Sequence, residues 1–365
     1  MSELTASLRD AGLPGASPGS ARASASDDAP PRPSHPTYAA LDLGTNNCRL
    51  LVARPDRERG FKVVDSFSRI VRLGEGLAHS GRLSDDAIGR AVSALQVCSD
   101  KMKARGVSRA RLIATEACRQ AANGADFLDR VRRETGLELE IIDRATEARL
   151  AAAGCASLAD PAAGGVILFD IGGGSSEVVW LERKRGAGAL SMRAWSSLPV
   201  GVVTLAERHG GVKVTTEVFE SMVAEVEGLL ASFPERETLS ASLSDIHFLG
   251  TSGTVTTIAG VHLGLPRYER RLVDGQWMAA TDVTRVVESL KEMSYDQRCS
   301  NPCIGPDRAD LVLAGCAILE AIRRAFPVAR LRVADRGLRE GILVELMRAD
   351  GVWRRRGSRR RGRRG

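Results

Sequence analysis

The chain has no segment near the roughly 20 consecutive apolar residues that a membrane-spanning helix requires. It also has no unbroken apolar stretch of the kind found in secretory signals, because polar and charged residues interrupt Leu4–Leu13. These absences exclude a helical membrane protein and disfavour export. We therefore expect a cytoplasmic protein that makes no membrane contact.

Paired metal-binding cysteines are also lacking. Cys299 and Cys303 have no second pair, and the five histidines are dispersed, so no spacing matches a zinc or redox motif. We expect reduced thiols, most of them in the core. The seven cysteines are Cys48, Cys98, Cys118, Cys155, Cys299, Cys303 and Cys316.

The body of the chain lacks an excess of positive charge. The formal net charge is +7, but Trp353–Gly365 holds eight arginines and no acid, so the remainder carries −1. The positive charge is a property of this tail and says little about an active site. The tail is either a solvated terminus or a weak binder of polyanions, whose affinity would depend steeply on salt.

The chain does contain a glycine-rich hairpin pattern at Val166–Leu181. A buried-type run ends at Asp170, passes through three glycines and two serines, and resumes at Glu177 as a second apolar run. Successive glycines let backbone N–H groups converge on an anion, because no Cβ blocks close approach. Two carboxylates beside a phosphate-sized turn favour Mg²⁺, which takes one or two protein oxygens and keeps several waters.

The same pattern occurs at Tyr38–Ala53, where Asp42 aligns with Asp170 and Arg49 with Glu177. Two copies of one strand–turn–strand unit predict two related lobes that face a shared cleft. A third turn, Gly250–Thr254, leads from a predicted strand into a helix, whose free N–H groups form another anion site. The residues expected to bind phosphates are Gly44, Thr45, Asn46, Asn47, Gly172, Gly173, Gly174, Ser175, Ser176, Thr251, Ser252 and Gly253.

These motifs carry a resemblance to a known family. The duplicated hairpin resembles the actin, sugar-kinase and chaperone-ATPase superfamily, with two RNase H-like α/β lobes around a central cleft. The ordered set LDLGTNN, TEACRQA, ATEARL, FDIGGGSSE, GTSGT and VADRGLREGIL resembles the exopolyphosphatase and guanosine-pentaphosphate phosphatase family, over roughly Tyr38 to Met347.

The resemblance implies a domain organisation. It places the first lobe at 37–150 and the second lobe at 151–335. Composition alone predicts that residues 1–36, rich in Ala, Ser and Pro, form a disordered extension. Residues 336–350 would form a helix that packs back on the first lobe, before the arginine-rich tail at 351–365. The resemblance is also compatible with a homodimer.

By the same resemblance, Glu147, Glu177 and Arg119 are the catalytic residues. Glu147 would be the general base, and Arg119 would hold the terminal phosphate with its planar fork. The expected ligands of Mg²⁺ are Asp42, Asp170 and Glu177.

The sequence departs from the family pattern at two places. Asp143-Arg144 replaces Ser-Gly, and Thr146 replaces the first of two acids, ahead of Glu147. Further on, Ala334 and Arg336 depart from the Ser-Asp-Gly that precedes the last helix. We expect these changes to alter loop shape, and hence substrate preference, without removing the base.

Four local expectations concern the surrounding elements. Ser84 and Thr281 are expected to cap helices, 138–142 to form a strand, and 116–121 to form a loop after the strand that ends at Thr115.

Together these features predict an Mg²⁺-dependent hydrolase of inorganic polyphosphate, of guanosine pentaphosphate, or of both, that releases orthophosphate. Two alternatives stay open. One is an ATP-dependent small-molecule kinase of the same superfamily, for which we find no adenosine pocket in the sequence. The other is a non-catalytic protein that binds polyphosphate or nucleic acid, as the arginine tail suggests.

Overall fold

The computed structural model describes residues 36–58, 60–183 and 190–353. The predictions for the N-terminal extension and the arginine-rich tail therefore concern residues that lie almost wholly outside the described part. All described residues belong to one compact unit.

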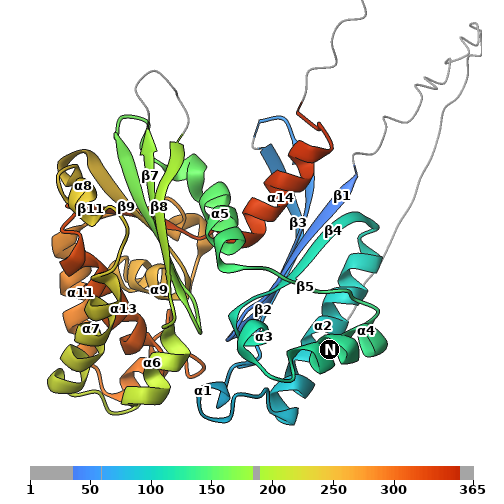
Figure 1. Cartoon of the computed structure of the whole chain (residues 1–365), viewed down its shortest axis with the longest axis horizontal. Coiled ribbons are helices and arrows are strands. Elements are labelled where there is room, and N and C mark those ends of the chain that lie inside the picture. The colour runs from blue at the N-terminus through green and yellow to red at the C-terminus, as the bar shows by residue number, and fades with distance from the viewer. Residues whose placement is uncertain (1–35, 59, 184–189, 354–365) are drawn as a thin grey trace, which may run out of the picture. The chain divides into compact units, whose positions relative to one another are not determined.

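The described residues form two β-sheets and the helices that flank them (Figure 1). The strands are β1 Thr37–Leu43, β2 Asn47–Asp56, β3 Gly60–Ile70, β4 Val107–Ala114, β5 Glu140–Ile141, β6 Gly165–Ile171, β7 Ser176–Arg183, β8 Leu190–Leu198, β9 Ile246–Thr251, β10 Trp277–Ala279 and β11 Arg330–Ala334. The helices are α1 Leu77–Ser80, α2 Asp85–Ala104, α3 Glu116–Gln120, α4 Gly124–Thr135, α5 Arg144–Cys155, α6 Val202–His209, α7 Thr216–Leu230, α8 Arg236–Ser240, α9 Gly253–His262, α10 Arg270–Val273, α11 Ala280–Glu292, α12 Tyr295–Ser300, α13 Val312–Ala325 and α14 Leu338–Ala349.

The two sheets repeat one topology. The first has the order β3-β2-β1-β4-β5, and the second has the order β10-β11-β9-β6-β7-β8. In each sheet, three strands that are consecutive in the chain pair antiparallel: β1, β2 and β3 in the first sheet, and β6, β7 and β8 in the second. The next strand, β4 or β9, then pairs parallel with the first of the three. The predicted duplicated α/β fold is confirmed.

The two predicted hairpins are confirmed, and their registers match. Asp42 pairs with Arg49 across β1 and β2, and Asp170 pairs with Glu177 across β6 and β7. Strands β1 and β6 are buried along nearly their whole length, which is typical of strands covered on both faces.

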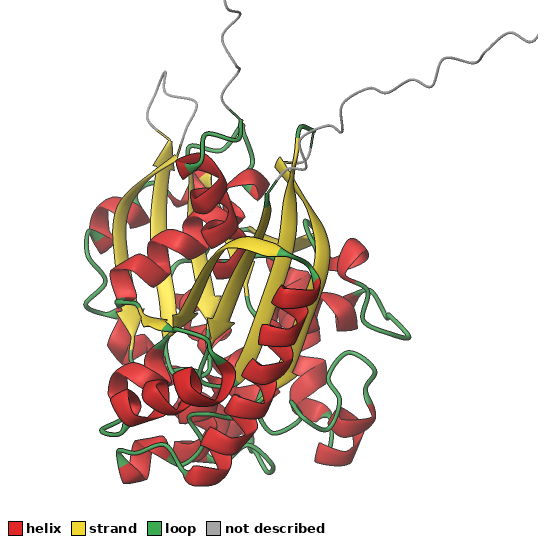
Figure 2. Cartoon of the chain, turned by 90° about the vertical axis from the view of Figure 1, so that its right-hand side faces the viewer, coloured by secondary structure: helices red, strands yellow, loops and turns green. Residues whose placement is uncertain are grey.

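Helices flank the two sheets on the sides that face away from each other (Figure 1), and Figure 2 shows helices lying in front of strands. Apolar side chains of α2 and α4 pack with those of the first sheet, and α7, α11 and α13 pack with those of the second. Between the sheets, α5 lies beside α14 (Figure 1). Helix α14 inserts Leu338, Ile342 and Leu343 into the core that contains Tyr38 and Ala40 of β1.

Glycines allow α5 and α14 to approach each other at backbone distance. A Cβ on Gly154 would collide with the carbonyl oxygen of Gly337, and a Cβ on Gly341 would collide with that of Leu150. Helix α5, which carries Glu147, is therefore held directly by the C-terminal helix.

Three local predictions were wrong. Residues 116–121 form helix α3 and its C-cap instead of a loop, and the expected strand at 138–142 shortens to the two residues of β5. Thr281 is not a cap, because the helix begins after Ala279, whose N–H donates to the Asp282 carboxylate at 3.2 Å. The prediction for Ser84 is confirmed, since its Oγ accepts from the N–H of Ala87.

The seven cysteines are free, and six of them are buried, as predicted. Within the described ranges, no helix is long and apolar enough to cross a membrane.

Candidate active site

A cleft of about 760 Å³ lies between the two sheets. It is lined by residues of both hairpins, the β9–α9 turn, α5 and the start of α14. Nearly all predicted site residues line it: Asp42, Gly44, Thr45, Asn46, Asn47, Glu147, Asp170, Gly172, Gly173, Gly174, Ser175, Glu177, Thr251, Ser252 and Gly253. Ser176 and Arg119 are the two predicted site residues that do not line the cleft. Ser176 donates from its Oγ to the carbonyl of Val200 at 2.7 Å.

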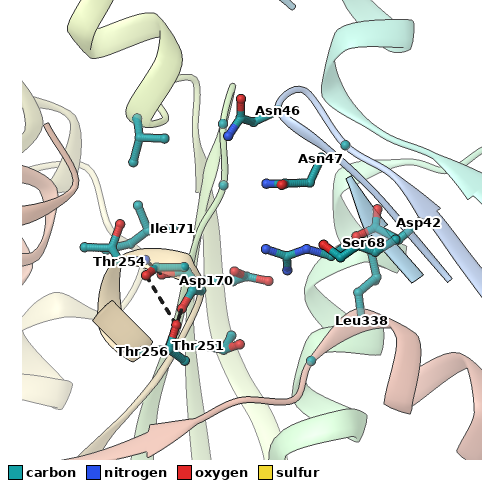
Figure 3. A pocket seen from close by; sticks show the side chains of 18 of the residues that line it. Asp42, Asn46, Asn47, Ser68, Asp170, Ile171, Thr251, Thr254, Thr256 and Leu338 are labelled. Carbon is teal, nitrogen blue, oxygen red and sulfur yellow. Dashed lines mark hydrogen bonds between the residues drawn. The ribbon is translucent and has the colours of Figure 1, made fainter. Parts of the chain in front are cut away.

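The first turn is closed by a backbone bond from Gly44 N–H to the Asn47 carbonyl, 2.9 Å long. The carbonyls of Thr45 and Asn46 accept bonds from residues 71–74, which fixes the turn to the end of β3. The Oδ1 atoms of Asn46 and Asn47 are buried and accept no hydrogen bond from any described residue. Figure 3 shows both asparagines beside the pocket, together with Asp42 and Asp170.

The second turn is closed in the same way, by Gly172 N–H and the Ser175 carbonyl at 2.9 Å. Its glycines are required because the two turns touch. A Cβ on Gly173 would lie 3.0 Å from Cβ of Thr45, and one on Gly174 would lie 2.7 Å from Oγ1 of Thr45. Among the residues described, the N–H groups of both glycines have no acceptor. The second turn therefore meets the first turn in the cleft and brings two unused N–H donors there.

The third turn leads from β9 into α9 through Ser252. This residue has φ of 134°, a region that non-glycine residues rarely adopt. Its Oγ accepts from the N–H groups of Thr254 and Val255 at 3.2 and 3.3 Å. Ser252 therefore lines the cleft with a strained backbone, and its side chain caps α9.

Three acidic side chains face the cleft from the two hairpins. Burial raises the pKa of Asp170 to about 6, with a smaller contribution from Asp42. Burial likewise raises the pKa of Glu177 to about 7, and Asp170 adds to it. Burial also raises the pKa of Asp42, although Arg49 and Arg339 offset part of the effect. Each carboxyl is therefore harder to ionise than in water.

Asp42 and Asp170 accept no hydrogen bond from the described residues, whereas Glu177 accepts one from Ser197 Oγ at 2.8 Å. Within residues 36–353, gaps excepted, no three His, Cys, Asp or Glu side chains converge closely enough to hold a metal by themselves. These acids could at most supply one or two ligands to an ion that also binds water or phosphate.

Glu147 enters the cleft from the first turn of α5. The helix begins there because the Asp143 carboxylate accepts from the Thr146 N–H at 2.6 Å. Asp143, which stands where the family pattern has serine, therefore still caps α5. The Glu147 Oε2 accepts from Arg119 Nη2 at 2.8 Å. Burial raises the pKa of Glu147 well above its ordinary value, and Glu177 raises it further, while Arg119 lowers it.

Arg119 contacts Glu147 without itself lining the cleft. It also donates to the buried Glu116 and to the Ile142 carbonyl, so its guanidinium is occupied by protein groups. The structure does not bring it to the cleft surface, where the sequence reasoning expected it to hold a phosphate. Glu116 was missed as a site residue; the i, i+3 spacing from Arg119 was the available signal.

Three further arginines were also missed. Arg49, Arg308 and Arg339 line the cleft, and none forms an ion pair with a carboxylate in the described part of the chain. Arg49 could have been found from sequence by its place opposite Asp42 in the first hairpin, and Arg339 by its place in the VADRGLREGIL motif. Together they make the cleft suitable for a polyanion.

The chain is similar to known proteins over most of its length. A model of the Ppx/GppA phosphatase family matches residues 51–350. Exopolyphosphatase 2 of Mycobacterium tuberculosis is 29% identical over 322 residues, which covers 84% of this chain and 98% of that protein. Exopolyphosphatase 1 of Mycobacterium bovis is 27% identical over 328 residues, which covers 86% and 89%.

Solved structures give the same picture. A Ppx/GppA family member from Aquifex aeolicus superimposes with a TM-score of 0.69 at 29% identity, covering 86% of this chain and 98% of that chain. An exopolyphosphatase-like protein superimposes with a TM-score of 0.77 at 27% identity, covering 87% and 99%.

Proposed function

Because this chain belongs to the Ppx/GppA phosphatase family and is a hydrolase of phosphoanhydrides, we propose that its substrate is inorganic polyphosphate. It would cleave the terminal anhydride and release orthophosphate. The observation that carries this proposal is the meeting of the two turns in a cleft where the N–H groups of Gly173 and Gly174 have no acceptor and three arginines form no ion pair within the described residues. The names of the two mycobacterial relatives support the same substrate.

The binding step follows from these groups. Polyphosphate carries negative charge on every unit and has no base or sugar to recognise, so backbone donors and arginines along a cleft are sufficient. Gly173, Gly174 and the turn between β9 and α9 would hold the terminal phosphates. Arg49, Arg308 and Arg339 would neutralise neighbouring units.

In the cleavage step, Glu147 would take a proton from the attacking water. Its Oε2 is held by Arg119, which leaves Oε1 to orient the water. General base catalysis of this kind typically contributes ~10²–10⁴-fold. The raised pKa makes Glu147 a stronger base than an ordinary carboxylate, provided that it is ionised. Water attack at the terminal phosphorus breaks the bridging P–O bond, and the shortened chain leaves as the other product.

The donor set fits a divalent cation. Asp42 and Asp170 are half-buried acids without hydrogen-bond partners in the described chain, and Glu177 pairs in register with Asp170. We propose that Mg²⁺ binds among these three residues, one or two of which coordinate it directly, with phosphate and water completing its shell. A bound Mg²⁺ would neutralise charge on the phosphates as the bond breaks.

The test is phosphate release by the purified protein in Mg²⁺, comparing long-chain polyphosphate with guanosine pentaphosphate at equal terminal-phosphate concentration. We expect the higher kcat/KM with polyphosphate. A preference for guanosine pentaphosphate would reassign the substrate. Formation of ADP from ATP with a small acceptor would favour the kinase alternative, and binding of polyphosphate without release would favour the non-catalytic one.

A further inference from the structure

Glu116 is the most heavily hydrogen-bonded carboxylate near the cleft. It lies in the first turn of α3, with its side chain only 2% exposed. It accepts two bonds from Arg119, one from Gln120 and two from Arg144. On its other side it touches the second turn, since a Cβ on Gly174 would lie 3.3 Å from Glu116 Cγ.

Arg119 is shared between two acids. Its Nε and Nη2 donate to Glu116 at 3.0 and 2.5 Å, and Nη2 also donates to Glu147 at 2.8 Å. The bond to Glu147 is the only hydrogen bond that Glu147 receives from the described side chains. The position of Glu147 therefore depends on how strongly Glu116 attracts Arg119.

Arg144 supplies the second counter-charge to Glu116. Its Nη2 lies 2.5 Å from Oε1 and its Nε lies 3.2 Å from Oε2. Although Arg144 is 41% exposed and does not line the cleft, it stands one turn from Glu147 on α5. This arginine occupies the place where the family pattern has glycine, so the pair with Glu116 is a departure of this chain.

We propose that Arg144 and Glu116 act as a pair of positioning residues for the general base. Arg144 takes part of the charge of Glu116, so that Arg119 is not drawn wholly to Glu116 and keeps its bond to Glu147. The four residues form one alternating row of charges, Arg144, Glu116, Arg119 and Glu147, of which only Glu147 reaches the reacting atoms. This inference rests on the proposed role of Glu147 in phosphate release.

The experiment is a double-mutant cycle on phosphate release from polyphosphate. Arg144→Met leaves Arg119 as the only arginine that pairs with Glu116, so we expect kcat to fall about tenfold while KM stays within about twofold. Glu116→Gln also lowers kcat, because two arginines then converge on Glu147. In the double variant Arg119 pairs with Glu147 only, and we expect kcat to recover to within about threefold of wild type.

Two variants serve as controls. Arg144→Lys keeps the positive charge but lacks the planar guanidinium that donates two hydrogen bonds to Glu116. It should retain more activity than Arg144→Met. Arg149→Met removes another α5 arginine, 53% exposed and paired with Glu345, and should leave kcat unchanged. Thermal unfolding of every variant shows whether a lower rate comes from less folded protein or from a lower kcat.

An unchanged kcat in Arg144→Met, or a double variant no faster than the slower single variant, would overturn the proposal. If the wild-type protein itself releases no phosphate, the proposed function fails separately. Crystal structures of wild type and Arg144→Met then decide the positioning question, because the proposal requires the bond between Arg119 and Glu147 to be lost in the variant.

Discussion

Replacing Glu147 by glutamine tests the proposed chemistry most directly. The two side chains have the same shape, and the glutamine carbonyl can keep the 2.8 Å bond from Arg119 Nη2. The amide cannot accept a proton at neutral pH, so the variant loses the base while the cleft keeps its form. We expect kcat to fall by ~10²–10⁴, which corresponds to about 3–5 kcal/mol of barrier.

The assay is steady-state phosphate release, together with equilibrium titration of the inactive variant with polyphosphate. Affinity should stay within about threefold of the wild-type KM, because none of the proposed phosphate donors changes. Glu138→Gln is a matched control, since its side chain is 76% exposed and lies outside the cleft lining.

Two results would refute the reasoning. If kcat stays within about threefold of wild type, Glu147 is not the base. If KM rises while kcat is unchanged, Glu147 contributes to substrate binding and not to proton transfer.

Three other predictions concern the metal and the fold. Chelation by EDTA should abolish phosphate release, and Glu177→Ala should lower kcat and regain part of it in excess Mg²⁺; a rate indifferent to chelator contradicts the metal role. Asp65 has a pKa lowered to about 2 by hydrogen bonds from Arg105 and Lys101, so it stabilises the fold above pH 4 and less as pH falls toward 2. Asp65→Asn should therefore lose about 1 kcal/mol in urea titrations at pH 7 and little at pH 2.5, whereas an equal loss at both would be unexpected. Gly154→Ala should destabilise the fold by about 1–3 kcal/mol because its methyl meets the backbone of α14, while Gly89→Ala, in open space on α2, should be neutral or stabilising in the same thermal scan.

The hairpins could be predicted because their signals are local. An apolar run, an aspartate, a glycine turn and a second run are enough to specify Asp42 opposite Arg49 and Asp170 opposite Glu177. The predicted repeat agrees with the two sheets, because in each of them a later strand pairs parallel with the first strand of the hairpin.

The contacts behind the cleft could not be predicted in this way. Glu116 and Arg144 are 28 residues apart, and nothing in either segment marks them as partners. Arg119 was expected in the cleft because its role was taken from resemblance, whereas the buried acid beside it decides where its guanidinium points. Thr281 was a wrong cap for a similar reason, as β10 continues until Ala279 and leaves the capping role to Asp282.

The place of α14 in the chain has a consequence for how the protein is made. Its apolar side chains complete the core that contains Tyr38 and Ala40 of β1. Its glycines, Gly337 and Gly341, contact α5, the helix that carries Glu147. During synthesis on the ribosome, one face of the first lobe therefore stays uncovered over the nearly 190 residues between Leu150 and Leu338. Glu147, the proposed base, is supported only when α14 has emerged, so a chain released before Leu338 would carry the three turns proposed to bind phosphate without an assembled site.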